Sequence, residues 1–227
     1  TTPAALASGQ RMLVEYKPFE PTFSHPALAA RGMALLFARA AGPQALVLVD
    51  TGHHYQSQNI EQILAWLQHQ KMLGGLHFND RRYADDDLTL GSIDPYQVFR
   101  IFHEIQLYQW ENPTASGPAY VIDQSHNLKN KIEAMMQTVL AAQELYAKAC
   151  LVDLKKLMQL QRECRLVEAE ECLRTAFWTD VRPALRAWRE ARSLPQDPLQ
   201  ALRESGYVER ISQERGGKNK GGASSYA

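Results

Sequence analysis

The sequence predicts an α/β fold, more narrowly the C-terminal half of a (β/α)8 TIM barrel followed by C-terminal helices. Three observations support this prediction. Four apolar segments of strand length alternate with helix-like segments over residues 1–150, which is the rhythm of a parallel α/β fold. Each strand–helix pair takes about 35 residues, close to the spacing in a barrel of roughly 250 residues. One strand, Ala45–Val49, is apolar throughout, as strands buried on both faces of a parallel sheet are.

The first strand–helix pair is expected between residues 12 and 41. Met12–Lys17 reads as a strand that ends at a proline. Glu15 and Lys17 are two residues apart, so they share one face of that strand. An acid and a lysine on the same inward face suit a polar site at the mouth of a barrel. Ala27–Ala41 is predicted to be a helix, which Gly42-Pro43 ends.

The second pair begins with the apolar strand Ala45–Val49. Asp50 follows it directly, and two histidines come close behind, at positions 53 and 54. Asn59 is a good N-cap residue with Gln62 in the third helical position behind it. The helix that it opens is expected to bury one stripe, made of Ile60, Ile63, Leu64 and Leu67.

The third and fourth pairs complete the sheet. Leu76–Asn79 is the third predicted strand, preceded by Gly74-Gly75 as the end of the helix before it. Asp94-Pro95 supplies an N-cap and a proline in the first helical position. Ala119–Asp123 is the fourth strand. The two helices after these strands carry the apolar stripes Val98, Ile101, Phe102, Ile105 and Leu128, Ile132, Met135, Val139, Ala142, Tyr146.

Beyond residue 151 only helices are predicted. Leu151–Ala191 suggests two helices, with Pro183 near the start or at a break of the second, and Leu199–Glu214 suggests a last short one. We therefore expect a half-barrel with the site at 1–150, a helical extension for oligomerisation at 151–215 and a disordered tail at 216–227. Because four units make half a barrel, we infer that the chain is the C-terminal portion of a longer protein.

The composition argues against several functional classes. The chain has 227 residues with 25 basic and 25 acidic side chains, and zero formal charge argues against binding to nucleic acid or to anionic membranes. The longest apolar region, Met33–Val49, is interrupted by charged and helix-breaking residues, so nothing spans a bilayer. No signal peptide is recognised. The three cysteines, Cys150, Cys164 and Cys172, lack framework spacing and fit reduced thiols in the cytoplasm.

Acids and imidazoles follow the predicted strands. The loop after the third strand carries Asp80, Asp85, Asp86 and Asp87, whose carboxylates repel one another unless water separates them or a cation neutralises them. A solvated acidic loop is the alternative. In a barrel the carboxyl ends of the strands meet. We therefore expect one cluster, made of Glu15, Asp50, His53, His77, Asp85, Asp87, Asp123 and Lys17.

This set of oxygen and imidazole groups suits Mn²⁺, Mg²⁺, Co²⁺ or Zn²⁺. Seven candidate ligands exceed the needs of one ion with open positions, whereas two ions sharing a carboxylate would use them. Each residue also has a structural alternative. His53 and His54 could form a capping or surface pair, and Asp50 and Asp123 could cap the helices that follow them. Lys17 could be a surface lysine on an edge strand, and His77 could be a core histidine. The histidines without such company are expected to be structural, namely His25, His69, His103 and His126.

Several motifs resemble L-rhamnose isomerase of the type with broad aldose–ketose specificity, in the xylose isomerase-like barrel superfamily. They are Val14-Glu15-Tyr16-Lys17-Pro18-Phe19-Glu20, Val49-Asp50-Thr51-Gly52-His53-His54, Gly74-Gly75-Leu76-His77-Phe78-Asn79 and Tyr83-Ala84-Asp85-Asp86-Asp87-Leu88. The resemblance extends through Asp94-Pro95-Tyr96-Gln97, Phe99-Arg100, Asp123-Gln124-Ser125-His126-Asn127 and Thr179-Asp180-Val181-Arg182-Pro183. It thus covers nearly the whole chain.

The resemblance implies two divalent cations, Mn²⁺ above all, with Co²⁺, Mg²⁺ or Zn²⁺ as alternatives. Glu15, Asp50, His77 and Asp123 would hold a structural, substrate-binding ion. His53, Asp85 and Asp87 would hold a catalytic ion, with Asp50 shared. Lys17 would contact the sugar carbonyl oxygen, and Glu15, His77 and Asp123 would also bind substrate. Xylose isomerases proper tend to have a carboxylate where this chain has His77.

The resemblance further implies a cytoplasmic, homotetrameric sugar isomerase whose sugar pocket needs the missing half of the barrel or a partner subunit. Two alternatives stay open at this point. A metal-dependent hydrolase such as a phosphoesterase could use the same barrel, although it would prefer more histidines and a basic groove. A half-barrel could also be an inactive fragment that serves as an interaction module.

Overall fold

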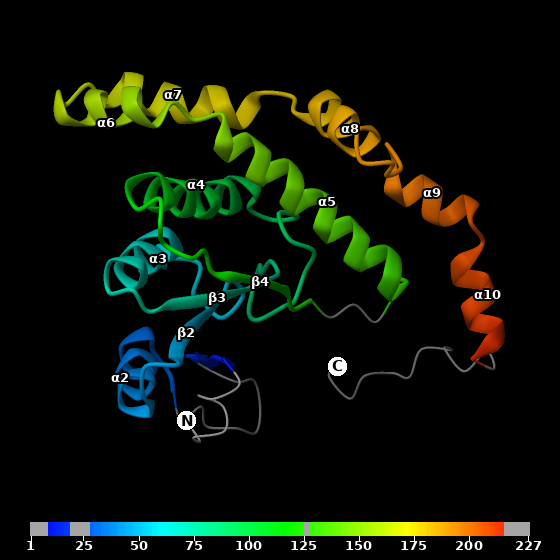
Figure 1. The fold of residues 1–227 in the computed structure, drawn as a ribbon, viewed down its shortest axis with the longest axis horizontal. Coiled ribbons are helices and arrows are strands. Elements are labelled where there is room, and N and C mark those ends of the chain that lie inside the picture. The colour runs from blue at the N-terminus through cyan, green and yellow to red at the C-terminus, as the bar shows by residue number, and fades with distance from the viewer. Residues whose placement is uncertain (1–8, 19–27, 125–127, 216–227) are drawn as a thin grey trace. The chain divides into compact units, whose positions relative to one another are not determined.

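A computed structural model of the chain describes residues 9–18, 28–124 and 128–215. The chain forms two compact units, which divide after Asp123. The first unit contains a sheet of four parallel strands in the order β1-β2-β3-β4. The strands are β1 (Met12–Glu15), β2 (Ala45–Asp50), β3 (Leu73–Phe78) and β4 (Ala119–Ile122). The connecting helices are α2 (Arg31–Ala41), α3 (Ile60–His69) and α4 (Pro95–Glu111) (Figure 1).

The predicted α/β class with a parallel sheet is thus confirmed. Sequential strand order leaves β1 and β4 at the two edges, as expected. The first strand ends two residues earlier than predicted, at Glu15. Helix α2 begins at Arg31, and residue 27, where we expected it to begin, lies outside the described residues. The C-cap of α2 is Gly42, as expected.

Both predicted N-caps are present. The Asn59 side chain accepts a hydrogen bond from the backbone N–H of Gln62, and Asp94 accepts one from Gln97, with Pro95 in the first turn of α4. The predicted stripe of α4 is buried throughout, and in α3 only Ile63 of the predicted stripe is not fully buried. These helices therefore begin and pack as their sequences dictate.

The two faces of the sheet differ in chemistry. Phe78 and Tyr120 lie against Phe102 of α4, with ring centroids 5.2 Å and 6.1 Å from that of Phe102. Because side chains alternate along a strand, His77 and Val121 point to the opposite face. His77 pairs in register with Asp50 of β2 on that same face. The apolar core therefore lies on the helix side, and the acidic and imidazole groups lie on the other.

Gly74 and Gly75 belong to strand β3, which corrects the prediction that the strand begins at Leu76. A Cβ atom on Gly74 would lie 2.5 Å from side-chain atoms of both Leu13 and Leu46. Because Gly74 has no side chain, Leu13 of β1 and Leu46 of β2 can pack closely against it. From the sequence, Gly74 is interpreted as the end of a helix. In the structure it is a strand residue whose lack of a side chain is required for packing.

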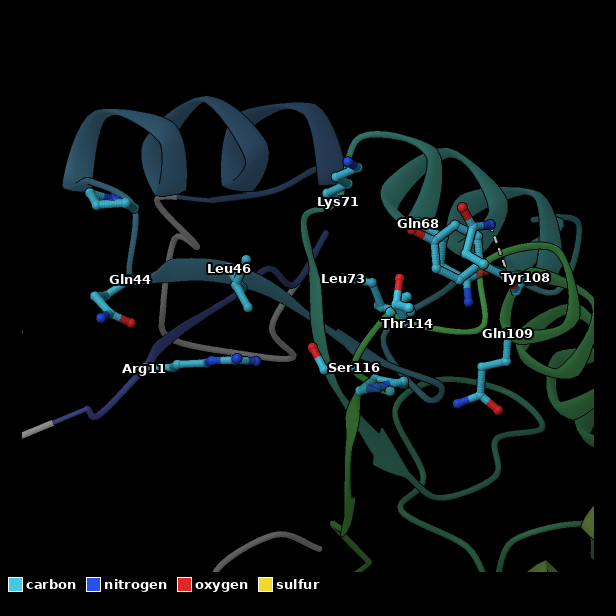
Figure 2. A pocket seen from close by; sticks show the side chains of 15 residues that line it. Arg11, Gln44, Leu46, Gln68, Lys71, Leu73, Tyr108, Gln109, Thr114 and Ser116 are labelled. Carbon is cyan, nitrogen blue, oxygen red and sulfur yellow. Dashed lines mark hydrogen bonds between the residues drawn. The ribbon is translucent and has the colours of Figure 1, made fainter.

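At the amino ends of the strands lies a cavity of about 440 Å³ (Figure 2). Its lining includes Arg11 and Lys71 but no carboxylate among the described residues. Neutral amides such as Gln44, Gln68 and Gln109 complete its polar surface. Among the described residues, the carboxylates that would attract a divalent cation therefore line the carboxyl end of the sheet and not this cavity.

The second unit begins at Gln124 and is helical over its described residues. Its helices are α5 (Lys131–Cys150), α6 (Leu154–Arg162), α7 (Leu166–Trp178), α8 (Arg182–Glu190), α9 (Pro198–Glu204) and α10 (Tyr207–Glu214). Helix α6 packs on α7, while α5 contacts α7, α8 and α9. Within the described residues no helix is long and apolar enough to cross a membrane. The three cysteines are free thiols.

The number of helices after residue 151 was predicted wrongly. Leu151–Ala191 holds three helices rather than two, because the chain turns at Cys164, whose φ is +54°. Leu199–Glu214 holds two rather than one, separated at Gly206, whose φ is +59°. Pro183 lies in the first turn of α8, the first of the two places considered for it. The tail 216–227 lies outside the described residues.

The apolar stripe of α5 is more exposed than predicted. Ile132, Met135, Val139 and Tyr146 are 37–41% exposed, whereas the buried positions are Ala134, Thr138, Leu145 and Ala149. Leu128 precedes the helix and is fully exposed. Apart from Leu145, the buried face of α5 therefore consists of small residues, and the larger apolar side chains of the predicted stripe are partly exposed.

Candidate metal centre

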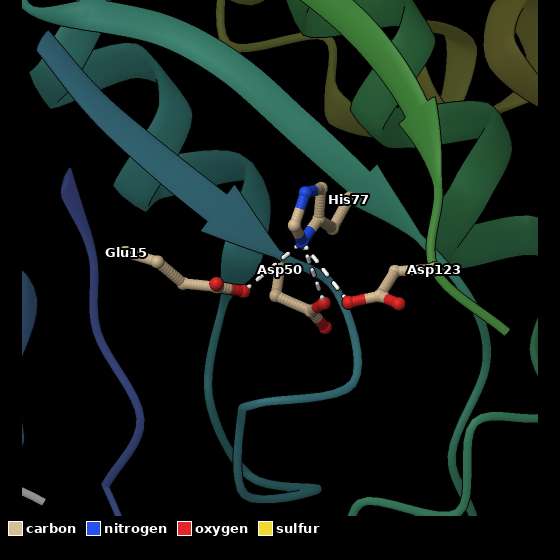
Figure 3. Close-up of side chains that lie close together, drawn as sticks. All are labelled: Glu15, Asp50, His77 and Asp123. Carbon is tan, nitrogen blue, oxygen red and sulfur yellow. Dashed lines mark hydrogen bonds and ion pairs between the residues drawn. The ribbon is translucent and has the colours of Figure 1, made fainter. Parts of the chain in front are cut away.

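The carboxyl ends of the four strands bring one imidazole and three carboxylates together. Glu15 and Asp50 are the last residues of β1 and β2, His77 lies near the end of β3, and Asp123 follows β4. The His77 Nδ1 atom lies 3.1 Å from Glu15 Oε1, 3.1 Å from Asp123 Oδ2 and 3.5 Å from Asp50 Oδ2 (Figure 3). One ligand atom from each residue lies within 4.8 Å of the others. We call these four residues the first cluster.

Asp50 also belongs to a second cluster, formed with His53 and Asp85. The His53 Nε2 atom lies 3.4 Å from Asp85 Oδ2 and 3.9 Å from Asp50 Oδ2. The other ring nitrogen, Nδ1, lies 3.2 Å from the backbone oxygen of Tyr16. When Nδ1 carries the proton and donates to that oxygen, the Nε2 lone pair faces the carboxylates. That is the orientation in which histidine binds a metal.

Lys17 and Asp87 complete the wall of the same site. The Lys17 Nζ atom forms an ion pair of 2.7 Å with Asp85 Oδ2. Asp87 lines a cavity of about 540 Å³ together with Lys17, Asp85 and members of the first cluster. Asp87 itself is not among the described residues whose ligand atoms lie within 4.8 Å of one another. The structure thus brings all eight predicted site residues to one end of the sheet.

The four acids of the loop after β3 divide into two pairs with different roles. The carboxylate of Asp80 accepts hydrogen bonds from the backbone N–H groups of Ile93 and Asp94, at 2.8 Å and 3.1 Å. Asp86 Oδ2 accepts three, from residues 82, 83 and 84. These two acids therefore fold the loop. Asp85 and Asp87 instead enter the cavity, where Asp85 Oδ1 is buried without a hydrogen-bond partner among the described residues.

Protonation in this site follows the crowding of its charges. The hydrogen bond that the His77 ring donates to Asp50 and the nearby carboxylates of Glu15 and Asp123 raise the pKa of His77 to about 9, against the opposing effect of burial. Burial and the neighbouring Asp85 raise the pKa of Asp87 to about 7. Burial opposes ionisation of Asp85 as well, but His53 and Lys17 bring its pKa below the ordinary value. The raised pKa values of His77 and Asp87 show that protons partly offset the negative charge of this site, as a bound cation would do.

The donor set fits divalent cations. It consists of carboxylate oxygens and imidazole nitrogens without thiolate, which suits Mn²⁺, Co²⁺, Mg²⁺ or Zn²⁺. The unpartnered Asp85 Oδ1 is an acceptor that such an ion would satisfy. The alternative, a loop of solvated acids after the third strand, does not describe Asp80, which is 4% exposed, or Asp85, whose side chain is 9% exposed.

Two buried residues that sequence reasoning missed hold the site together. Arg81 is 7% exposed and donates to the backbone oxygens of Thr51, His54 and Tyr55, so it fixes the loop that carries the second cluster. Asn79 is 1% exposed and lies between β2 and the end of β4. An asparagine at the end of an apolar strand is a signal that could have been read. Arg81 stands in an exposed-looking charged stretch, which gives no such signal.

His54 directly follows a member of the second cluster, is 2% exposed, and has its Nε2 atom 2.7 Å from the Tyr16 hydroxyl, so the alternative of a surface pair does not hold for it. His69 lies edge-on to Trp66 in α3. His103 belongs to neither cluster. His25 and His126 lie outside the described residues.

The fold and this site define an α/β protein with a candidate two-cation centre at the carboxyl edge of a parallel sheet. No protein-family model matches the chain. A Rhizobium meliloti (strain 1021) protein described as a probable sugar isomerase is 44% identical over 214 residues, 93% of this chain and 49% of the relative. A Mesorhizobium japonicum protein of the same description is 38% identical over 212 residues, again 93% and 49%. The chain spans about half the length of the curated relatives it matches.

Proposed function

We propose that the protein is a metal-dependent sugar isomerase that interconverts L-rhamnose and L-rhamnulose and related aldoses and ketoses. The observation that carries this proposal is the pair of ligand clusters that share Asp50, with Lys17 beside them. The descriptions of both relatives support the isomerase class. The choice of rhamnose rests on the motif resemblance.

We also propose that the chain forms the C-terminal half of a (β/α)8 barrel. Supporting observations are the sequential parallel strands, with β1 and β4 at the two edges of the described sheet, and the match to half of each relative. The helices of 151–215 would then serve assembly into a cytoplasmic homotetramer. In this proposal the other half of the barrel supplies most of the sugar pocket.

The roles of the site residues follow from the two clusters. Glu15, Asp50, His77 and Asp123 would hold the ion that binds substrate, and Glu15, His77 and Asp123 would also approach the sugar. His53, Asp85 and Asp87 would hold the catalytic ion, with Asp50 shared. Mn²⁺ is the proposed metal for both positions, and Co²⁺, Mg²⁺ and Zn²⁺ suit the same donors.

When bound, the two cations would supply Lewis-acid polarisation of the sugar carbonyl and of the neighbouring hydroxyl. In the proposed hydride shift, the hydrogen on C2 would move with its electron pair to C1, and the proton of the C2 hydroxyl would be transferred to the oxygen on C1. The ammonium of Lys17 would bind that oxygen and stabilise its developing negative charge. Asp87 lines the cavity beside Asp85, and its carboxylate oxygen that does not hold the ion would relay the proton.

The test uses the full-length polypeptide that carries this sequence, purified without chelator and supplied with Mn²⁺. We expect it to convert L-rhamnose to L-rhamnulose. With L-rhamnose deuterated at C2, a hydride shift keeps the deuterium on C1 of the product, whereas an enediol route exchanges it with solvent. Release of nitrophenol from p-nitrophenyl phosphate, without sugar isomerisation, would replace this proposal with the hydrolase alternative.

A further inference from the structure

The clusters depend on a buried side chain that is not one of their ligands. Asn79 directly follows β3 and is 1% exposed. Its Nδ2 atom donates to Asp50 Oδ1 at 3.1 Å and to the backbone oxygen of Asp123 at 2.8 Å. A longer contact of 3.4 Å joins the same nitrogen to Asp50 Oδ2. Because its partners are all acceptors, this end of the amide must be the NH₂ group.

Asn79 thereby joins the ends of three neighbouring strands. Its backbone N–H donates to the hydroxyl oxygen of Thr51 at 3.0 Å, and that hydroxyl lies 2.8 Å from the backbone oxygen of Asn79. Thr51 immediately follows β2, and Asp123 immediately follows β4. Thr51 therefore fixes the backbone of Asn79. The side-chain amide of Asn79 in turn holds Asp50 at the end of β2 and Asp123 after β4.

The two oxygens of Asp50 have different surroundings as a result. Oδ1 accepts hydrogen bonds from Asn79 and from the backbone N–H groups of Gly52 and His53, at 2.7 Å and 3.3 Å for the latter two. Oδ2 faces the ring nitrogens of both clusters, at 3.5 Å from His77 Nδ1 and 3.9 Å from His53 Nε2. One oxygen is thus occupied by the protein, and the other is directed at both candidate ion positions.

We propose that Asn79 is a positioning residue that orients Asp50 so that its Oδ2 atom faces the ligand groups of both clusters, and that it anchors the backbone at Asp123. This inference rests on the proposed two-cation site and deepens it. A carboxylate at position 79 could not donate to Asp50 and would repel it. An apolar residue there would leave the Asp123 carbonyl and the buried Asp50 Oδ1 with fewer donors.

The test measures Mn²⁺ binding to the full-length polypeptide by calorimetry and by electron paramagnetic resonance. For the unaltered protein we expect two ions per chain with a spin-coupled spectrum, because the two clusters share Asp50 and their ions would therefore lie close together. Asn79→Ala should lower Mn²⁺ affinity at both positions by roughly 10–100-fold and remove the coupled spectrum. Asn112→Ala, which removes an amide that caps α4, is the matched control and should change neither.

A second pair of variants covers the case in which Asn79→Ala does not fold. Thr51→Val removes the hydroxyl that holds the backbone of Asn79, whereas Thr51→Ser keeps it. We expect the coupled spectrum to be lost in Thr51→Val and retained in Thr51→Ser. Two spin-coupled ions of unaltered affinity in Asn79→Ala, or in Thr51→Val where the former is unfolded, would refute the positioning role. Absence of Mn²⁺ binding by the unaltered protein would instead refute the proposed two-cation function.

Discussion

Replacing Gly52 by alanine is a small change that the structure predicts to be damaging. A Cβ atom at this position would lie 2.5 Å from Asn79 Oδ1 and 2.9 Å from Asp85 Oδ1. Carbon and oxygen atoms that are not bonded require more than 3 Å, so the added methyl must displace both side chains. Gly52 does not have a positive φ, and the backbone itself would therefore accept alanine. The expected loss of stability and activity in Gly52→Ala therefore comes from the close contacts of the new methyl group with Asn79 and Asp85.

The magnitude follows from the size of the required shift. Moving a buried side chain to accept one methyl group costs about 1–3 kcal/mol of unfolding free energy. The displaced groups are Asp85, a ligand of the second cluster, and Asn79, which orients Asp50. A displacement of about 1 Å in such a site lowers turnover by roughly 100-fold. We therefore expect Gly52→Ala to lose both stability and the second ion.

The matched control is Gly32→Ala in helix α2. Nothing lies within 4 Å of a Cβ atom at Gly32, so alanine should raise helix stability by roughly 0.5–1 kcal/mol. Denaturant unfolding and Mn²⁺ calorimetry on both variants of the full-length polypeptide measure the two effects. Unchanged stability and two tightly bound ions in Gly52→Ala would refute the reasoning from atomic crowding.

Three further predictions concern the catalytic ion, the response to pH and the open sheet. Asp87→Asn or His53→Asn should leave sugar binding in place but lower kcat by ~100-fold or more, because only the catalytic ion is lost; near-normal kcat in steady-state assays would contradict this. Burial lowers the pKa of His54 from 6.5 to about 4, so the unfolded chain takes up its proton first as the pH falls. Stability from neutral His54 should be complete above pH 6.5 and decline by about 3 kcal/mol toward pH 4. His54→Gln should lack this decline in denaturant unfolding measured across that range, and an unchanged decline would count against the assignment. Residues 1–227 expressed alone should self-associate and lack isomerase activity with Mn²⁺, because β1 and β4 are open edges; a monomeric, active protein in ultracentrifugation and assay would show the architecture to be misread.

The fold of the first unit could be predicted because its signals are local. An uninterrupted apolar run, Ala45–Val49, marked a buried strand, and Asn59 and Asp94 marked helix starts through the hydrogen bonds that they make. The errors occurred where a local signal has two physical meanings. Gly74 reads as a break, yet it lies within a strand because Leu13 and Leu46 need its empty space.

The helices after residue 151 show a different limit. Cys164 turns the chain with a positive φ, a conformation that non-glycine residues seldom adopt, so composition did not mark the turn. The partly open stripe of α5 has a related cause. Periodicity identifies the apolar face of a helix, but it does not say whether anything covers that face, as the 41% exposure of Val139 illustrates.

The candidate site could be predicted as a set of residues but not as a geometry. Strand ends in a parallel sheet converge, so the positions of Glu15, Asp50, His77 and Asp123 followed from sequence order alone. Which acids of the loop enter the site did not. Asp86 and Asp87 are adjacent acids, and only the structure assigns the former to backbone N–H groups and the latter to the cavity.

The distribution of charge, rather than its sum, decides which ligands this site can accept. The whole chain has equal numbers of acidic and basic residues, yet five carboxylates gather at the carboxyl end of the sheet, where Lys17 forms an ion pair with one of them. Such a concentration of like charge attracts divalent cations and repels anions. The neutrality of the whole chain is therefore compatible with a strongly anionic site at one end of its sheet.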